Sequence, residues 1–525
     1  MEGLLIVVVL GATVLVGTTI GRRYSVAPPV LLIVFGGLLG LIPAFSEVRL
    51  PSDVVLLLFL PAILYWESLN TSLREIRSNL RVIILSAVVL VIVTMVGVSY
   101  TLQGIGLVAS AAWILGAVLA PTDAAAVAGL AKRMPRRALT TLRAESLIND
   151  GTALVLFAVA VGALVDGHVP GPALLVGELI WSSVGAVLVG TVVGYAVVLI
   201  RRYVDDPQRE GGLSILTPFV AFLVAEVVHT SGVVAVVVAG LVLSWAGPRV
   251  IRARSRLETY SFWDLGTFML NGSLFVLVGV QFPAAVRGIT RSFGHAVWIA
   301  LLTAATVIVI RLAWSHVAAM VIRLVDRRPV QRTRRVNWKV RTASGWAGFR
   351  GAVSLAAALA VPATLDDGTR YAERDLIVFV TSVVIVVTVL VQGLTLPMVV
   401  RWAGLTSDEE REVETRNARI RATEVALAAL PDIATRFGAP DEVVERIRDE
   451  YQGHLDQLRA EGTEHAVQSW QDQVDRRVRL EVLDRKRRAV TAMRDDREID
   501  DIVLRDLQAS MDIEEVRLLG PAPTD

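Results

Sequence analysis

The sequence predicts an all-α polytopic membrane protein with about 13 transmembrane helices in inverted repeats, two of them broken, followed by a helical tail. The chain has 525 residues, is 54% hydrophobic and has a mean hydropathy of +0.58, which excludes an ordinary soluble protein. Apolar runs of about 20 residues recur, and each is long enough to cross ~30 Å of hydrocarbon. Beyond these runs the composition changes sharply to charged, amphipathic sequence. The chain contains no cysteine, so disulfide and thiolate chemistry are excluded.

The expected spans follow from the positions of the apolar runs, and their orientation follows from the basic loops between them. We place spans at residues 3–20, 27–43, 53–68, 80–101, 109–130, 142–164, 173–200, 213–228, 232–246, 260–280, 294–322, 340–361 and 375–403. Most loop Lys and Arg residues then fall on one side of the membrane, which is the cytoplasmic side by the positive-inside rule. The N-terminus is expected outside, and the C-terminal tail is expected in the cytoplasm.

Two domains are expected, a membrane domain at residues 1–405 and an acidic helical tail at 406–525. The tail alternates charged helical segments with Pro and Gly punctuation, which is typical of a small helical domain. A solvated structural or dimerising tail and a regulatory domain both fit this composition.

The fifth and twelfth spans are interrupted in their middles. The fifth contains Pro121-Thr122-Asp123, and the twelfth contains the glycine-rich run from Gly345 to Gly351 with Arg350 inside it. Proline removes a backbone donor and clashes with the preceding helical turn. The two spans are seven apart in order, so they cross the bilayer in opposite directions. Paired broken helices in inverted repeats indicate the site of a transporter.

The sixth span carries the most unusual charge, Asp150, because an isolated carboxylate at membrane depth is costly unless it is paired, protonated or ligated. Ser146 lies four residues before Asp150 and shares its helix face. Asp123 and the Thr122 carbonyl are expected to approach from the broken fifth span. Together these groups offer hard oxygen ligands, which suit Na⁺ or Li⁺.

A buried carboxyl can be neutralised by a proton or by a cation. If both compete for Asp150, each cycle exchanges one for the other, provided that the site faces one side of the membrane at a time. The sequence therefore predicts a transporter of Na⁺ and H⁺ rather than an enzyme, with no cofactor.

Arg350 remains charged in the membrane and needs a partner. Glu145 is the expected partner because it is the other unexplained charge near the site. The alternatives are that Arg350 extends to the membrane surface or pairs with Asp123. Asn149 lies next to Asp150 and is expected to support the site.

Other polar residues give weaker signals. Asn271 interrupts the tenth span, where it could line an aqueous access path or serve in helix packing. Glu226 and His229 lie at the end of the eighth span, where they could belong to that path or lie at the membrane interface. Glu67 is expected at the interface.

The motifs Ala120–Val127, Glu145–Gly151 and Gly348–Leu355 resemble those of sodium/proton exchangers of the monovalent cation:proton antiporter-1 family, as does the run Ala225–Gly240. The resemblance covers residues ~3–405 and implies a plasma-membrane homodimer, a six-helix core with crossed broken helices, and elevator-like alternating access.

The resemblance also implies roles for particular residues. Asp150 carries the ion, and Thr122, Asp123 and Ser146 supply further ligands. Glu145 and Arg350 form an ion pair. An asparagine at position 149 is the pattern of electroneutral, one-for-one exchangers.

Three alternatives remain at the level of sequence. One is K⁺/H⁺ antiport at the same site. Another is an intramembrane aspartyl protease that uses Asp123 and Asp150 as a dyad. The last is a sensor that does not transport and signals through its tail.

Overall fold

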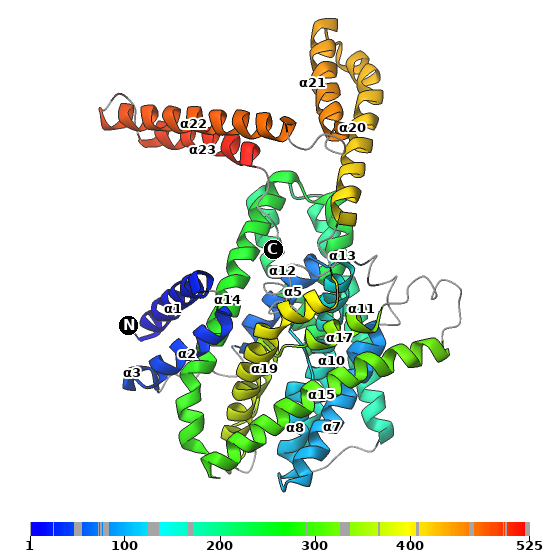
Figure 1. The fold of residues 1–525 in the computed structure, drawn as a ribbon, viewed down its shortest axis with the longest axis vertical. Helices are drawn as coiled ribbons and strands as arrows, with labels where there is room; N and C mark the ends of the chain where they lie inside the picture. The colour runs from blue at the N-terminus through cyan, green and yellow to red at the C-terminus, as the bar shows by residue number, and fades with distance from the viewer. Residues whose placement is uncertain are drawn as a thin grey trace. The chain divides into compact units, whose positions relative to one another are not determined.

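The structure is a computed structural model that consists of helices, and none of the residues that it describes forms a named β-strand (Figure 1). It describes residues 2–519 apart from gaps, the longest of which are 47–54, 77–82, 124–135, 166–171, 326–336 and 461–466. The predicted all-α fold class is confirmed. The chain divides into two compact units, Met1–Ser407 and Asp408–Asp525.

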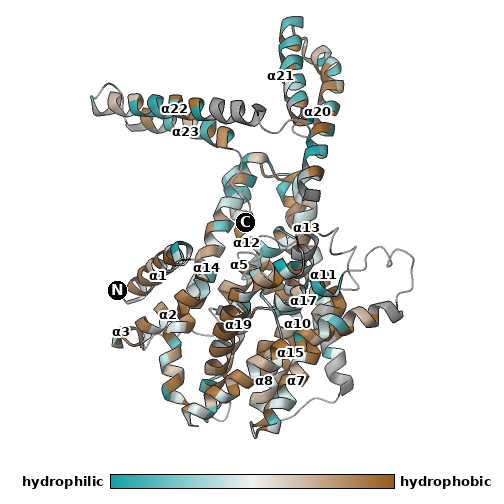
Figure 2. Cartoon of the chain, in the orientation of Figure 1, coloured by the Kyte–Doolittle hydropathy of each residue, from teal (hydrophilic) through white to brown (hydrophobic). Residues whose placement is uncertain are grey.

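Within the described part of the first unit, nine helices are long and apolar enough to cross a membrane. They are α1 (Glu2–Tyr24), α7 (Leu90–Gly104, with a preceding π-helical turn), α10 (Arg136–Val165), α11 (Pro172–Arg201), α12 (Pro207–Val227), α13 (Gly232–Val250), α14 (Ala253–Gly288), α15 (Phe293–Val325) and α19 (Arg374–Trp402). Each coincides with an expected span. Brown, apolar colouring covers much of these helices in Figure 2.

The other four expected spans contain shorter helices, so the count of 13 is not confirmed. They are α2 (Pro28–Gly40, followed by α3, Pro43–Ser46), α5 (Leu60–Leu69, after a π-helical turn), α8 (Ala109–Leu119), and the pair α17 (Trp338–Trp346) and α18 (Ala352–Ala360). The break between α17 and α18 lies at the predicted position. Helix α8 ends before Pro121, and the remainder of that span, 124–130, lies outside the described residues.

The helices of the first unit pack in two sets. One set, which we call the broken-helix group, contains α7, α8, α10, α15, α17, α18 and α19. The other, which we call the flanking group, contains α1, α2, α5 and α11 to α14. The groups meet where α14 packs on α18 and α19 and where α10 packs on α5, α11 and α13. This boundary positions the site described below.

The second unit consists of two helix pairs. Helix α20 (Glu409–Phe437) packs on α21 (Asp441–Ala460), and α22 (Val467–Asp495) packs on α23 (Asp501–Leu519). Leu455, Leu483 and Met511 are among the few buried apolar side chains, and teal, hydrophilic colouring is common on these helices in Figure 2. An amphipathic pair of helices with a narrow apolar seam is a water-exposed arrangement.

Candidate functional site

The two helix breaks contact each other directly. The backbone N–H of Asp123 donates to the Phe349 carbonyl at 2.9 Å, and Nε of Arg350 donates to the Leu119 carbonyl at 2.8 Å. Leu119 is the last residue of α8, and the last carbonyls of a helix have no partner within it and carry partial negative charge. The Arg350 guanidinium, which comes from the break between α17 and α18, therefore caps the C-terminal end of α8.

Gly351 allows this close approach. A Cβ atom added to Gly351 would overlap the side chain of Asp123. A larger residue at this position would displace the Asp123 carboxylate from the contact between the two breaks.

Helix α10 places three polar side chains against the same break. The Ser146 hydroxyl donates to the Thr122 carbonyl, and Asn149 Nδ2 donates to the Thr122 hydroxyl at 2.8 Å. The Thr122 carbonyl, expected to approach from the broken fifth span, thus accepts a hydrogen bond from Ser146. Asp150 follows Asn149 on α10 and is 4% exposed. The break is held to α10 through both oxygens of Thr122.

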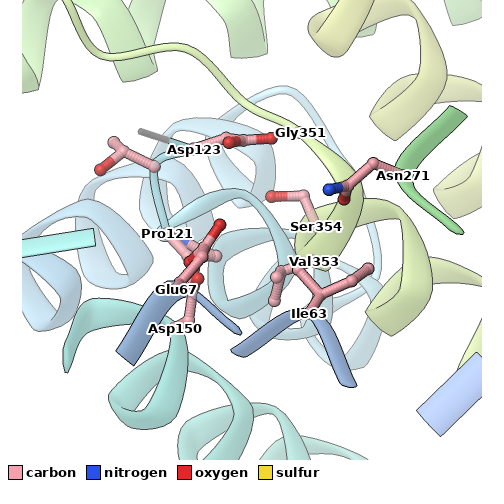
Figure 3. A pocket seen from close by; sticks show the side chains of 10 residues that line it. Ile63, Glu67, Pro121, Asp123, Asp150, Asn271, Gly351, Val353 and Ser354 are labelled. Carbon is pink, nitrogen blue, oxygen red and sulfur yellow. The ribbon is translucent and has the colours of Figure 1, made fainter. Parts of the chain in front are cut away.

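A small cavity of about 10 Å³ lies beside Asp150, with room for roughly one water-sized particle (Figure 3). Its walls come from both helix groups. The lining residues are Ile63, Glu67, Pro121, Thr122, Asp123, Asp150, Asn271, Gly351, Val353 and Ser354. Ile63 and Glu67 come from α5 and Asn271 comes from α14, so these three belong to the flanking group. The other lining residues come from the broken-helix group. The cavity therefore lies at the boundary between the groups.

Three carboxyl groups share this cavity. Glu67 and Asp123 both act electrostatically on Asp150, and Asp123 also acts on Glu67. No Lys or Arg side chain is among the lining residues. Buried carboxylates this close together cannot all stay negatively charged unless a proton or a cation is bound among them. The arrangement can therefore hold either.

The expected ion pair between Glu145 and Arg350 is wrong, because Glu145 pairs with a different arginine. Glu145 Oε1 instead binds Arg311 Nη1 from α15, and both side chains are buried. Arg350 donates to the carbonyls of Leu119 and Gly348, and Glu145 affects it electrostatically without direct contact. One carbonyl from each break thus accepts a hydrogen bond from the Arg350 guanidinium, while Arg311 projects from an intact helix and binds the Glu145 carboxylate.

The weaker sequence signals divide between the cavity and the surface. Asn271 lines the cavity, as described above. Glu226 and His229 are exposed at the end of α12 and are not among the lining residues. Glu67, which we expected at the membrane interface, is part of the cavity wall. The expectation is wrong because α5, although it ends at Leu69, packs on α10 and brings Glu67 to the cavity.

Sequence reasoning missed Arg311 and gave Ser354 no role. Arg311 interrupts the apolar run Ile308–Trp314, which is the same signal that identified Asp150. Ser354 stands in the motif after the twelfth-span break, and its hydroxyl-bearing side chain lines the cavity. Its neighbours gave no sign of which side of α18 faces the site.

Comparison with known proteins identifies the family. The profile of "Sodium/hydrogen exchanger, transmembrane" matches residues 10–402. The chain is 53% identical over 528 residues to an uncharacterised Na⁺/H⁺ exchanger of Mycobacterium bovis, covering 100% of this chain and 97% of that protein. It is 31% identical over 442 residues to the Na⁺/H⁺ antiporter ApNhaP of Aphanothece halophytica, covering 82% of this chain and 80% of that protein.

The fold is also similar to a solved structure. The sodium proton antiporter MjNhaP1 of Methanocaldococcus jannaschii matches with a TM-score of 0.59 and 19% identity, covering 76% of this chain and 98% of that chain. At this identity the likeness shows the fold alone. The family assignment rests on the sequence matches, which confirm the predicted resemblance: the chain belongs to the sodium/hydrogen exchanger family of cation/proton antiporters.

Proposed function

We propose that this protein exchanges Na⁺ for H⁺, one for one, across the plasma membrane, with the two ions competing at Asp150. The observation that carries the proposal is the small cavity in which Asp150, Asp123 and Glu67 meet at the contact between two broken helices. The family consists of transporters rather than enzymes, which removes the aspartyl protease alternative, and its transported ions are substrates rather than cofactors.

The competition follows from the charge of the cavity. A bound proton neutralises Asp150 when no cation is present, and a cation that displaces it restores the same net charge. Asn149 has no ionisable group, and its amide donates to Thr122. It therefore positions Thr122 and cannot carry a second proton, which supports one-for-one, electroneutral exchange.

The cation ligands that we propose are the carboxylates of Asp150 and Asp123, the hydroxyl of Ser146 and the carbonyl of Thr122. The Ser146 hydroxyl donates to the Thr122 carbonyl in the structure, so these two oxygens are already adjacent. A cation between them would replace that hydrogen bond while both oxygens stay in place. Hard oxygen donors of this kind suit a small alkali cation.

Alternating access has a physical basis in the two helix groups. Asp150, Asp123 and the α17–α18 break belong to the broken-helix group, whereas Glu67 and Asn271 belong to the flanking group. Movement of one group against the other would open the cavity toward one side of the membrane and then the other. We propose this elevator-like movement within a homodimer, with the N-terminus outside and residues 406–525 forming a cytoplasmic, regulatory tail.

The test is ion-driven dissipation of a pH gradient in proteoliposomes that contain the full chain. Added Na⁺ should collapse the gradient, and Asp150→Asn should reduce the rate by at least ~100-fold because the variant cannot exchange a proton at this position. Asp264→Asn is the matched control, since Asp264 is an exposed carboxylate on α14 and does not line the cavity. Replacing Na⁺ by Li⁺ or K⁺ in the same assay distinguishes Na⁺/H⁺ from K⁺/H⁺ antiport. A gradient that persists with all three ions refutes exchange, as does full activity of Asp150→Asn.

A further inference from the structure

A second hollow lies away from Asp150, on the outer side of the flanking group, between α11 and α13. The two helices pack closely at Gly190, which faces Ala235 and Val238, and at Gly194, which faces Val242. Beside this contact the larger side chains separate and leave a groove of about 320 Å³. Its lining residues are Leu73, Val187, Thr191, Tyr195, Val238, Leu241, Val242 and Trp245.

The groove opens toward the bilayer. Val187, Tyr195 and Trp245 are each between 44% and 48% exposed, and both helices are long enough to span the membrane. Apart from the Thr191 hydroxyl and the polar tips of Tyr195 and Trp245, the lining side chains are hydrocarbon. Apolar surface at membrane depth is filled by hydrocarbon rather than by water. An acyl chain fits this chemistry, and the lining residues follow one another along both helices, Val187, Thr191 and Tyr195 on α11 and Val238, Val242 and Trp245 on α13.

A cation lies at one end of this groove. The Arg249 guanidinium stacks over the ring of Trp245, 5.5 Å from the ring centroid. Arg249 is exposed in the last turn of α13, and among the described residues it has no recorded ion pair or hydrogen bond. The neighbouring Arg252, in contrast, is paired with Asp205. Trp and Tyr side chains typically mark the membrane–water interface, and a basic residue beside them meets the lipid head groups.

We propose that this groove binds a phospholipid with an anionic head group, whose acyl chain lies between α11 and α13 and whose phosphate binds Arg249. The stacking on Trp245 holds the guanidinium in place, so less side-chain freedom is lost when the phosphate binds. Two N–H groups of a guanidinium match a phosphate geometrically. The proposal does not depend on the ion exchange mechanism.

A second copy of the chain is a poorer occupant of the same groove. A twofold axis along the membrane normal places the Arg249 ends of the two grooves at the same depth in the membrane. Neither helix would then offer Arg249 a carboxylate, because α13 contains no Asp or Glu, Glu178 lies near the other end of α11, and Asp205, which follows α11, is paired with Arg252. The charge at the groove therefore favours an anionic lipid over self-association.

Native mass spectrometry of the purified full chain tests the proposal with two added lipids that share the same acyl chains, palmitoyl-oleoyl phosphatidylglycerol and palmitoyl-oleoyl phosphatidylcholine. The wild-type protein should retain phosphatidylglycerol in preference to phosphatidylcholine. Arg249→Gln should lower this preference about tenfold, because the phosphate loses a charge-assisted pair. Val187→Trp, which fills the groove, should lower retention of both lipids.

Two variants serve as matched controls. Arg209→Gln removes one exposed charge near the start of α12, where Arg209 is 3.7 Å from Asp206. Val192→Trp enlarges a residue that is 68% exposed on α11 but does not line the groove. Both should retain lipid as the wild type does.

The proposal is overturned if Arg249→Gln keeps the full preference for phosphatidylglycerol. It is also overturned if Val187→Trp dissociates a dimer while lipid retention is unchanged, because the groove would then be an interface between copies. Should Val187→Trp not fold, Arg249→Gln alone decides the outcome.

Discussion

The buried pair of Glu145 and Arg311 joins α10 to α15, and Arg311 lies against Gly348 in the break between α17 and α18. Removing one partner of a buried ion pair leaves an uncompensated charge and costs about 3–5 kcal/mol. We expect Glu145→Gln and Arg311→Gln each to lower the unfolding temperature of the purified protein strongly, and the double variant to lower it by much less than the sum. Thermal unfolding in a single detergent measures all three variants.

The same comparison of single and double variants, made with Arg350 in place of Arg311, provides the control for this pair. Glu145 affects Arg350 electrostatically but does not contact it. The combination of Glu145→Gln and Arg350→Gln should therefore be close to additive, since residues without direct contact couple weakly. Strong coupling of Glu145 to Arg350, with none to Arg311, would show that the ion pair in the functioning protein is the one expected from the sequence.

Glu67 adds a third carboxyl group to the cavity from the flanking group, and this carboxyl attracts a cation when it is ionised. Replacing it with glutamine should raise the KM for Na⁺ about tenfold, the factor that corresponds to a loss of ~1.4 kcal/mol of attraction between the carboxylate and the bound cation. Initial rates of Na⁺-driven proton release in proteoliposomes give this KM. Glu226→Gln should leave the KM unchanged, since Glu226 is exposed at the end of α12 and does not line the cavity. Equal effects of both substitutions would contradict a role for Glu67 at the site.

Single residues were predictable from the sequence where a charge or a break stood in an apolar run. This signal identified Asp150, Asp123 and Arg350, and applied to α15 it would also have identified Arg311. It could not assign partners, because a sequence does not show which buried oxygens remain unpaired after folding. Glu67 was missed for a related reason, since the sequence does not show that the end of α5 packs on α10.

At the scale of the helices, the crossing of the two breaks depends on one glycine. A Cβ at Gly351 would overlap the Asp123 carboxylate, so Gly351→Ala should displace Asp123 and greatly reduce exchange while the protein still folds. Gly162→Ala is the matched control, because no atom lies within 4 Å of the added Cβ on α10. The two variants are compared by transport rate and by unfolding temperature. Normal transport by Gly351→Ala would show that the contact between the breaks is not needed for function.

Helix positions could be predicted more fully than helix contacts. Nine expected spans coincide with long helices because their apolar runs exceed the thickness of the bilayer. The break between α17 and α18 was predicted from its glycines, and the end of α8 from Pro121. The grouping of helices into two sets was not accessible from the residues alone, because hydropathy does not distinguish a face that packs on protein from one that meets lipid. That grouping was expected only from the family resemblance.

At the scale of the whole molecule, the proposed ion site and the tail belong to separate compact units. All cavity-lining residues lie between Ile63 and Ser354, and the first unit ends at Ser407. The tail helices pack in pairs with each other, α20 with α21 and α22 with α23. A chain that ends after Leu405 should therefore still insert into membranes and exchange Na⁺ for H⁺ with an unchanged KM.

The same truncated chain tests the proposed regulatory role of the tail. A regulatory tail shifts the equilibrium between states of the membrane domain, so its removal should change the pH range over which exchange occurs without changing the ion ligands. Rates measured from pH 6 to pH 9 in proteoliposomes, for the full and truncated chains side by side, show this shift directly. Asp150→Asn in the truncated chain should remain inactive, which confirms that the residual exchange uses the same site. An unchanged pH range would assign the tail a structural role, and loss of exchange in a well-inserted truncated chain would show that residues 406–525 are part of the transport machinery.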